Sequence, residues 1–285
     1  MQSSVNKKFI DIDEIFKSKN PGLYRILPGF ILKYLKKVAH QEDINSFINR
    51  HGHRQELDFV DAIVDEFGAH VVVEGIENIP LSGGCVFASN HPLGGLDAMS
   101  MVQIIGRKRT DIKFIVNDIL LQLKNLKGIF IGVNKHGKNS TEIHQTLDQW
   151  YASGSAILIF PAGLVSRNQN GQIMDLEWRK SFITKARKFK IDIIPVFIGG
   201  RNSSFFYNLS KIRNMVGIKA NIEMLYLADE MYRQKNKTIT VIFGKAIPCT
   251  LLDESYSDQE WAQLVKKHVY SLQTEGPQHT MNTAS

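Results

Sequence analysis

The stretch GCVFASNHPLGGLD, residues 84–97, decides the fold that we expect for this chain. It begins with an apolar run after a glycine pair, which is typical of a buried β-strand. Pro92 and the second glycine pair, Gly94-Gly95, then break regular structure, so the strand must end in a turn. From Asp97 onward apolar residues recur at helical spacing, which predicts a helix with an acid at its start. These residues therefore predict a strand, a turn and a helix in immediate succession.

The same stretch contains a histidine and a carboxylate that such a turn can bring together. His91 lies at the strand end and Asp97 at the helix start. An imidazole hydrogen-bonded to a carboxylate is the arrangement of an oriented general base. The alternative is that His91 lies in an ordinary loop and Asp97 only caps the helix. From these residues alone both interpretations remain open.

Strand-like and helical patterns alternate through most of the chain. The strands expected besides the one above are residues 71–73, 112–116, 129–133, 156–160, 193–198 and 239–243. The helices are expected at 41–50, 55–67, 118–125, 140–152, 177–189, 204–217 and 255–272. This alternation predicts an α/β fold with a mixed, mostly parallel central sheet flanked by helices. Pro195 inside one strand indicates either an edge position or a break in the ladder.

We expect three parts along the chain. A helical segment, residues 1–67, precedes an α/β domain at 68–250, and a C-terminal helix with a disordered tail fills 251–285. Between Leu23 and Val38 apolar residues recur at intervals of three and four, with basic residues beside them, and Pro28 should kink or divide this helix. Such a helix can lie in a membrane interface or pack on the protein core, and both remain open.

The composition limits the partners and the location. The chain has 285 residues and a net charge of +7, which favours acidic partners such as nucleic acid, anionic lipid or an acidic carrier protein. We expect no nucleic acid, because no reader motif is recognisable. The two cysteines, Cys85 and Cys249, predict neither a disulfide framework nor a metal site. With no signal peptide and no long apolar run, we expect the cytoplasmic face of a membrane, reached peripherally.

Other expected strand ends carry polar residues that could bind substrate. Ligands of α/β sheets gather at the carboxyl ends of the strands. Gly163, Ser166 and Arg167 follow one strand and Lys135 follows another. Arg201 precedes an aromatic cluster that could meet a lipid or simply begin a buried helix. Arg167 suits an anionic headgroup, although a surface salt bridge is the alternative interpretation.

Four blocks in order resemble the glycerolipid acyltransferases, which transfer an acyl chain to the hydroxyl of a lysophospholipid. The blocks are Asn90-His91 with Asp97, Gly128 to Ile131, Phe160 to Arg167, and Ile194 to Val196, preceded by a similar segment at Gly75 to Pro80. The match extends over about residues 71–196. Within the family it is most similar to the bacterial branch that O-acylates ornithine or glycine aminolipids.

Two departures from the family pattern concern the acceptor. Ala162 stands where the family has a glutamate, and Lys135 lies near the place of a missing arginine. Those positions normally help to hold a glycerol phosphate, so the resemblance favours an aminolipid acceptor whose headgroup carries a carboxylate. A third departure is the spacing, with five residues between His91 and Asp97 where the family usually has four. The aminolipid branch shows similar spacing.

The resemblance implies an O-acyltransferase acting on a monoacylated lipid, a lyso-ornithine or lyso-glycine lipid. His91 would be the general base and Asp97 its partner, with Asn90, Gly163, Ser166, Arg167, Lys135 and Arg201 as substrate-binding candidates. The co-substrate would be a thioester of acyl carrier protein or coenzyme A, with no cofactor and no metal. The alternatives are a lysophosphatidate acyltransferase and an inactive lipid-binding member of the family.

The chemistry of acyl transfer adds one requirement, which is donors for the oxyanion of the tetrahedral intermediate. The candidates are backbone N–H groups near Gly94 or Gly163, and Arg167. Direct transfer without an acyl-enzyme is preferred, because no nucleophile-elbow motif occurs.

Overall fold

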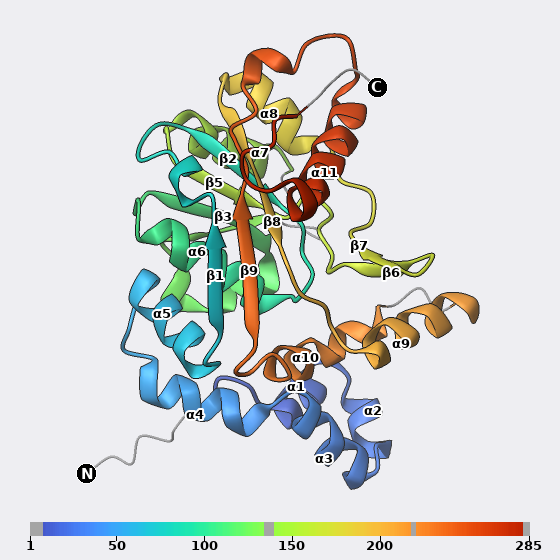
Figure 1. Ribbon diagram of the computed structural model, residues 1–285. Coiled ribbons are helices and arrows are strands. Elements are labelled where there is room, and N and C mark those ends of the chain that lie inside the picture. Colours follow the sequence, from blue (N-terminus) through green and yellow to red (C-terminus); the bar gives the residue numbers. More distant parts are fainter. Residues whose placement is uncertain (1–7, 134–139, 218–220, 282–285) are drawn as a thin grey trace.

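A computed structural model describes residues 8–133, 140–217 and 221–281 (Figure 1). In these residues a seven-stranded sheet has the order β1-β9-β8-β2-β5-β3-β4, and a separate hairpin pairs β6 with β7. The strands of the sheet are β1 (His70–Glu74), β2 (Cys85–Ser89), β3 (Ile112–Asn117), β4 (Phe130–Val133), β5 (Ala156–Ile159), β8 (Asp192–Ile198) and β9 (Thr238–Phe243). The hairpin strands are β6 (Arg167–Gln169) and β7 (Gln172–Met174).

Most neighbouring strands of the sheet are parallel. Among the described strand pairs of this seven-stranded sheet, only β8 and β9 are antiparallel. In Figure 1 the arrow of β9 points upward, so β8 and the strands parallel to it end at the lower edge, beside α9 and α10. The expected class, a mixed and mostly parallel sheet flanked by helices, is confirmed.

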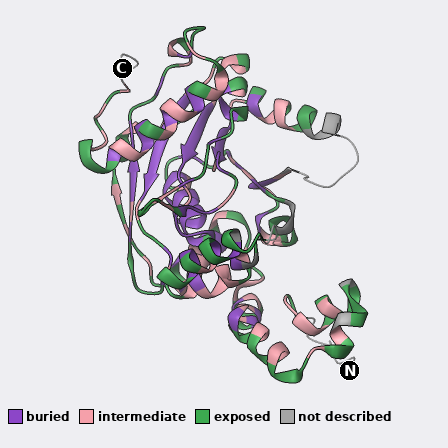
Figure 2. Cartoon of the chain, turned by 90° about the vertical axis from the view of Figure 1, so that its right-hand side faces the viewer, coloured by how far each residue is buried: buried purple, intermediate pink, exposed green. Residues whose placement is uncertain are grey.

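The central strand β2 is buried on both faces, which explains its unbroken apolar sequence. Its alternate side chains point to opposite faces, as the twofold period of a strand requires. Cys85 and Phe87 belong to one core cluster, and Val86 and Ala88 belong to the other. Figure 2 shows these buried strands between layers of helices. Helices α5 and α6 supply residues to the first cluster, whereas α8 and α11 supply residues to the second.

The helices follow the expected order with some shifted boundaries. They are α1 (Ile12–Lys19), α2 (Pro21–Ile26), α3 (Gly29–Val38), α4 (Gln41–His51), α5 (Glu56–Glu66), α6 (Gly95–Gly106), α7 (Ser140–Ala152), α8 (Ser181–Phe189), α9 (Ser204–Met215), α10 (Leu227–Tyr232) and α11 (Asp258–Glu275). Short 3₁₀ helices are η1 (Ile76–Asn78), η2 (Asp118–Gln122), η3 (Lys124–Leu126), η4 (Ile222–Tyr226) and η5 (Cys249–Leu251). Pro28 divides α2 from α3, as expected. Within the described residues no helix has both the length and the apolar character to cross a bilayer.

Two expectations about local structure differ from what the structure shows. The helix expected from residue 177 begins at Ser181, and the hairpin of β6 and β7 precedes it. Strands of three residues are too short to show an alternating pattern of apolar and polar residues, so the sequence did not indicate this hairpin. The edge position for Pro195 is wrong, because β8 lies between β9 and β2. The expected break in the ladder is confirmed on the β9 side of β8. There Pro195 lies between the isolated Ile193–Ile247 bridge and the β8–β9 ladder, which begins at Val196.

The C-terminal helix α11 buries a histidine in the second core cluster. His268 is 5% exposed, and the ring of His279 from the following segment lies 5.2 Å away. Burial, with a smaller contribution from His279, lowers the pKa of His268 from 6.5 to about 4. Between those two pH values the unfolded chain binds a proton that the folded chain does not, so stability falls as the pH drops.

We therefore expect His268→Leu to remove part of the acid sensitivity of folding. Between pH 7 and pH 5 the wild-type protein should lose about 2 kcal/mol more unfolding free energy than the variant. Urea unfolding at the two pH values measures this difference. His53→Gln, at an exposed histidine, is the matched control and should behave like the wild type. Equal pH dependence of the wild type and His268→Leu would contradict the buried neutral state of His268.

Candidate active site

The site lies at the carboxyl end of β2, where the chain turns into α6. Nδ1 of His91 is 3.0 Å from Oδ2 of Asp97. The same oxygen accepts hydrogen bonds from the backbone amides of Leu93 (2.9 Å) and Gly94 (3.1 Å). Because amides only donate, this oxygen acts as an acceptor, so Nδ1 carries a proton, and in the neutral imidazole Nε2 then holds the lone pair. The imidazole is thus held in the tautomer that a general base needs.

The turn between the two side chains requires a glycine. Gly94 has φ of 92°, a conformation that residues with a side chain rarely adopt. Helix α6 begins at the next residue and places Asp97 in its first turn, where the carboxylate is completely buried. The five residues between His91 and Asp97 therefore fit within the turn, and the unusual spacing does not separate the pair.

The imidazole of His91 is also held from one face by an aromatic ring. Phe160 follows β5, the parallel neighbour of β2, and its ring stacks on His91 with centroids 3.9 Å apart and planes 15° apart. The side chain of His91 remains 17% exposed. A hydrogen bond at Nδ1 and a stacked ring leave the imidazole little freedom to rotate. Its remaining exposure gives a substrate hydroxyl access to the ring.

A second buried carboxylate, Asp175, holds the backbone of this turn, and we did not predict it. Its Oδ1 accepts from the amide of His91 (3.2 Å) and the hydroxyl of Ser166 (2.6 Å), and its Oδ2 accepts from Nε1 of Trp178 (2.8 Å). Burial raises the pKa of Asp175 above its ordinary value, opposed by these donors. A single acid after a short hairpin has no characteristic spacing, so no sequence pattern could have identified it.

The side chain of Asn90 joins the catalytic turn to the neighbouring strand. Its Nδ2 donates to the carbonyl of Ile198 (2.8 Å), and its Oδ1 accepts from the amide of the same residue (2.7 Å). Asn90 is 2% exposed. The contacts of Asn90 in this structure are therefore with β8, and they fix the position of the strand end that carries His91.

Arg167 lies in the protein interior rather than at the surface of the site. Its guanidinium donates to Oε1 of Glu223 (2.9 Å) and to the carbonyl of Val165 (2.5 Å). It also lies over the ring of Phe206, 5.1 Å from the centroid. Burial lowers the pKa of Arg167, although the neighbouring Glu223 opposes this change. The sequence offered a surface salt bridge as the alternative; the salt bridge is present, but the surface position is wrong, because both partners are buried.

The remaining candidates occupy different surroundings. Gly163 is exposed, and a Cβ built on it would lie 3.8 Å from the guanidinium carbon of Arg179. Arg201 is exposed, with its carbonyl accepting from Gln234 (3.3 Å). Lys135 lies outside the described residues. Ala162 is 5% exposed and packs in the second apolar core cluster, so a glutamate there would enter an apolar environment.

All three of the expected oxyanion donors already have partners. The amide of Gly94 donates to Asp97 (3.1 Å), and the amide of Gly163 donates to the carbonyl of Phe160 (2.9 Å). Arg167 is paired with Glu223. In this conformation, therefore, these groups stabilise the turns themselves.

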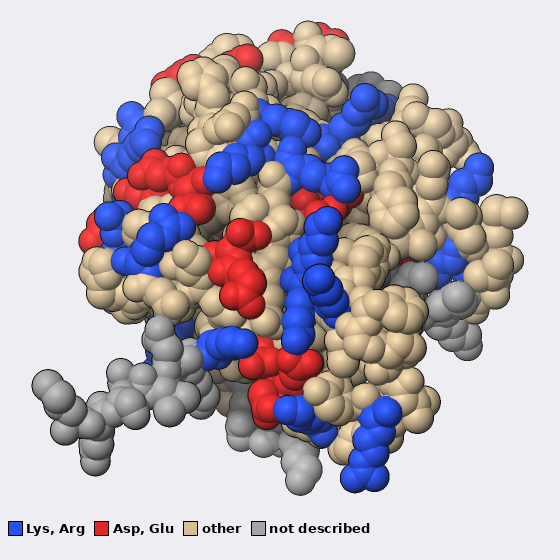
Figure 3. Space-filling model, turned by 90° about the horizontal axis from the view of Figure 1, so that it is seen from below, with Lys and Arg blue, Asp and Glu red and all other residues tan. Residues whose placement is uncertain are grey.

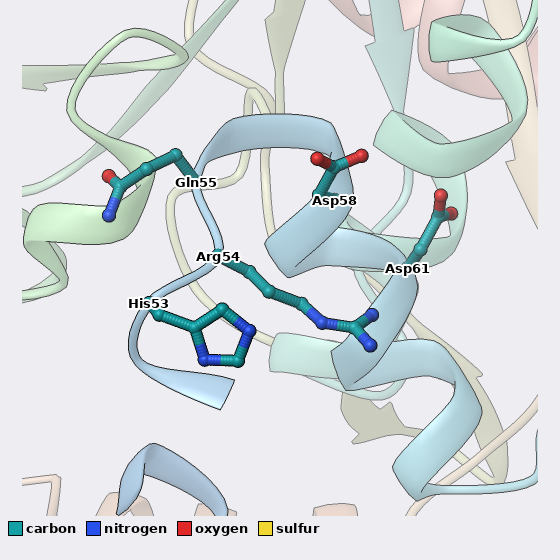
Figure 4. A pocket seen from close by; sticks show the side chains of 5 residues that line it. All are labelled: His53, Arg54, Gln55, Asp58 and Asp61. Carbon is teal, nitrogen blue, oxygen red and sulfur yellow. The ribbon is translucent and has the colours of Figure 1, made fainter. Parts of the chain in front are cut away.

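A separate surface cavity lies at the start of α5, away from the residues above. It has a volume of about 460 Å³ and is lined by His53, Arg54, Gln55, Asp58 and Asp61. Figure 4 shows Arg54 running along the helix whose carboxylates line the other side of the cavity. No group of three histidine, cysteine or acidic side chains in the described part of the chain could hold a metal ion.

The chain belongs to the acyltransferase family, whose model matches residues 14–276. It is thus an enzyme that transfers an acyl group from a donor to an acceptor, and the resemblance read from the sequence is confirmed.

Two similar proteins cover nearly the whole chain. A lyso-glycine lipid O-acyltransferase of Bacteroides thetaiotaomicron is 45% identical over 92% of this chain and 97% of its own length. A lyso-glycine lipid O-acyltransferase of Phocaeicola vulgatus is 42% identical over 92% of this chain and 95% of its own length. The crystal structure of the 1-acyl-sn-glycerophosphate (LPA) acyltransferase PlsC from Thermotoga maritima covers 85% of this chain and 96% of its own, at 14% identity and a TM-score of 0.46. That structural likeness is too weak to support a conclusion.

Replacing Asp97 by asparagine tests the role of the carboxylate. Asparagine has a similar shape, but one of its two terminal groups is an NH₂ that only donates. It therefore cannot accept both the hydrogen bonds that reach Oδ2 of Asp97 from His91 and the turn and the one that reaches Oδ1 from the amide of Ala98. We expect kcat for acyl transfer to fall by about 10²- to 10⁴-fold. Steady-state kinetics measure this, and a thermal melt checks that the fold persists. Asp58→Asn, at an exposed carboxylate, is the control. An Asp97→Asn variant with unchanged kcat would rule out the proposed orienting role.

Proposed function

We propose that this acyltransferase moves a fatty acyl chain from a thioester to the hydroxyl of a lyso-glycine lipid. The observation that carries this proposal is the likeness to two lyso-glycine lipid O-acyltransferases over nearly the whole chain. The hydrogen-bonded pair of His91 and Asp97 supports it, because an alcohol needs a base to attack a thioester near neutral pH.

The residues of the site suggest how the proton moves. Nε2 of His91 takes the proton of the lipid hydroxyl as its oxygen attacks the thioester carbonyl. Asp97 accepts from Nδ1 and stabilises the imidazolium that forms. When the tetrahedral intermediate collapses, the carbon–sulfur bond breaks and the imidazolium returns the proton to the leaving thiolate. The products are the diacylated lipid and a free thiol.

The headgroup carboxylate of the acceptor needs a cation that has no buried acidic partner. Arg167 is committed to Glu223, so exposed arginines at the same edge of the sheet are better candidates. The side chain of Arg179 lies beside Gly163, which belongs to the loop that follows β5 and Phe160. Arg201 follows β8, the other neighbour of β2. We propose these two arginines as the groups that bind the carboxylate.

The donor and the location are also proposals. Acyl carrier protein or coenzyme A supplies the thioester, and both are anionic, which suits a net charge of +7. The enzyme acts at the cytoplasmic face of a membrane, bound peripherally by α3. Along that helix Phe30 is 75% and Tyr34 48% exposed, with exposed Lys33 and Lys37 beside them. This arrangement supports insertion into an anionic interface.

An acylation assay with purified protein tests the acceptor. Lyso-glycine lipid and lysophosphatidate are offered separately with acyl carrier protein or coenzyme A thioesters, and the lipid products are identified by mass spectrometry. We expect product from lyso-glycine lipid, and a fall of at least about 10²-fold in His91→Ala, because that variant lacks the base. His53→Ala is the matched control at an exposed histidine. Acylation of lysophosphatidate alone would overturn the proposal.

A further inference from the structure

Helix α9 exposes three large apolar residues on one face and buries two polar residues on the other. Ile212 is 57% and Met215 77% exposed, and Phe205 on the same face is 50% exposed. The opposite face buries Ser210 and Arg213, which are 4% and 8% exposed. A helix in contact with water normally shows the reverse distribution. The exposed face of α9 therefore fits an apolar environment outside the protein.

The apolar face of α9 continues into the exposed stripe of α3. The ring of Phe205 meets the ring of Tyr226 edge-on, with centroids 5.0 Å apart. The hydroxyl of Tyr226 lies 3.0 Å from the hydroxyl of Tyr34 on α3. Leu225, beside Tyr226, is 62% exposed. Two segments far apart in the sequence thus form one surface, at the lower end of the molecule in Figure 1.

The two chain segments that form this surface contain more basic than acidic residues. No aspartate or glutamate occurs between Glu14 and Glu42, and none occurs between Asp192 and Glu223. Exposed cations border the apolar residues of both helices, including Lys33 on α3 and Lys211 on α9. Figure 3, which views the molecule from this end, shows Lys and Arg beside broad uncharged areas, with several groups of Asp and Glu among them. An anionic bilayer matches both features, because its headgroups attract the cations and its acyl chains accept the apolar side chains. Two copies of the chain would instead bring like charges together across a symmetric interface.

This surface is connected directly to the catalytic turn. The buried face of α9 places Phe206 in a small cluster with Val165, and Leu227 of α10 packs against that cluster. A Cβ built on Gly94 would lie 3.4 Å from the side chain of Leu227. The segment that carries the exposed apolar face is thus adjacent to the turn that holds His91.

We infer that α9 and η4 form a second membrane-binding element, which inserts the exposed face of α9 into an anionic bilayer beside α3. This inference adds to the contact proposed for α3 and places the bilayer next to the catalytic turn. A lysolipid then needs to leave the bilayer only over the short distance across α9.

Vesicle binding tests the inference without any substrate. Full-length protein is mixed with vesicles of phosphatidylcholine and phosphatidylglycerol, or of phosphatidylcholine alone, and the bound fraction is measured by sedimentation. We expect Ile212→Ser/Met215→Ser to bind the mixed vesicles roughly tenfold more weakly than the wild type. Leu81→Ser is the matched control, because Leu81 is 71% exposed but lies just before β2, at the opposite end of that strand from His91. It should bind like the wild type.

A second measurement reports insertion directly. Met215→Cys in a Cys249→Ser background is labelled with an environment-sensitive dye, whose emission should shift to the blue on mixed vesicles. Cys85 is buried and does not compete for the label. Thermal melts confirm that the variants fold.

Three results would overturn the inference. They are unchanged vesicle binding by the double variant, the absence of a dye shift on bound vesicles, and a wild-type dimer in light scattering that the double variant dissociates. Because no acyl donor or lysolipid is present, the result does not depend on the acceptor. Normal vesicle binding together with failure to acylate lyso-glycine lipid would contradict the proposed function alone.

Discussion

The buried carboxylate of Asp97 is the constraint on which the site depends. A charged oxygen without water must have its hydrogen bonds supplied by the protein, and Oδ2 receives them from His91, Leu93 and Gly94. Two of these donors are the backbone of the turn itself. The interaction that orients the imidazole therefore also closes the turn between β2 and α6. Local structure and catalytic geometry cannot be separated here, since losing the carboxylate would release both.

The surrounding elements fix the same turn from three other directions. Phe160, at the end of β5, restrains the imidazole by stacking. Asn90 bonds to the backbone of β8, and Asp175 accepts from the amide of His91. Each contact comes from a neighbouring strand or the loop after it, because parallel strands end at one edge of the sheet. This redundancy explains how a short, glycine-rich turn can be rigid enough to hold a general base.

The sequence was sufficient for the parts of the structure that follow periodic patterns. It predicted the α/β class, the division of the helix at Pro28, and the proximity of His91 and Asp97. It was not sufficient for the surroundings of Arg167. Ser166 and Arg167 come after a buried strand, a position where residues often face a ligand. In the structure both are buried, and Arg167 begins a hairpin whose two strands have three residues each. Their partners, Asp175 and Glu223, are 9 and 56 residues away in the chain. Contacts of that kind depend on tertiary packing, which no local spacing records.

The inward direction of Arg167 also explains the unusual character of α9. Glu223 is completely buried; it accepts a hydrogen bond from Arg167 and forms an ion pair with Arg213, with nitrogen–oxygen distances of 2.9 Å each. The charged side chains of Arg167, Arg213 and Glu223 can be buried together only when each one has a partner of opposite charge. The inner face of α9 contributes Arg213 to this cluster. Phe206 adds its ring to the guanidinium of Arg167. Phe205, Ile212 and Met215 lie on the other side of the helix, away from this cluster, and remain exposed. The polar cluster thus attaches α9 to the hairpin of β6 and β7, and it leaves the exposed apolar face of α9 directed outward.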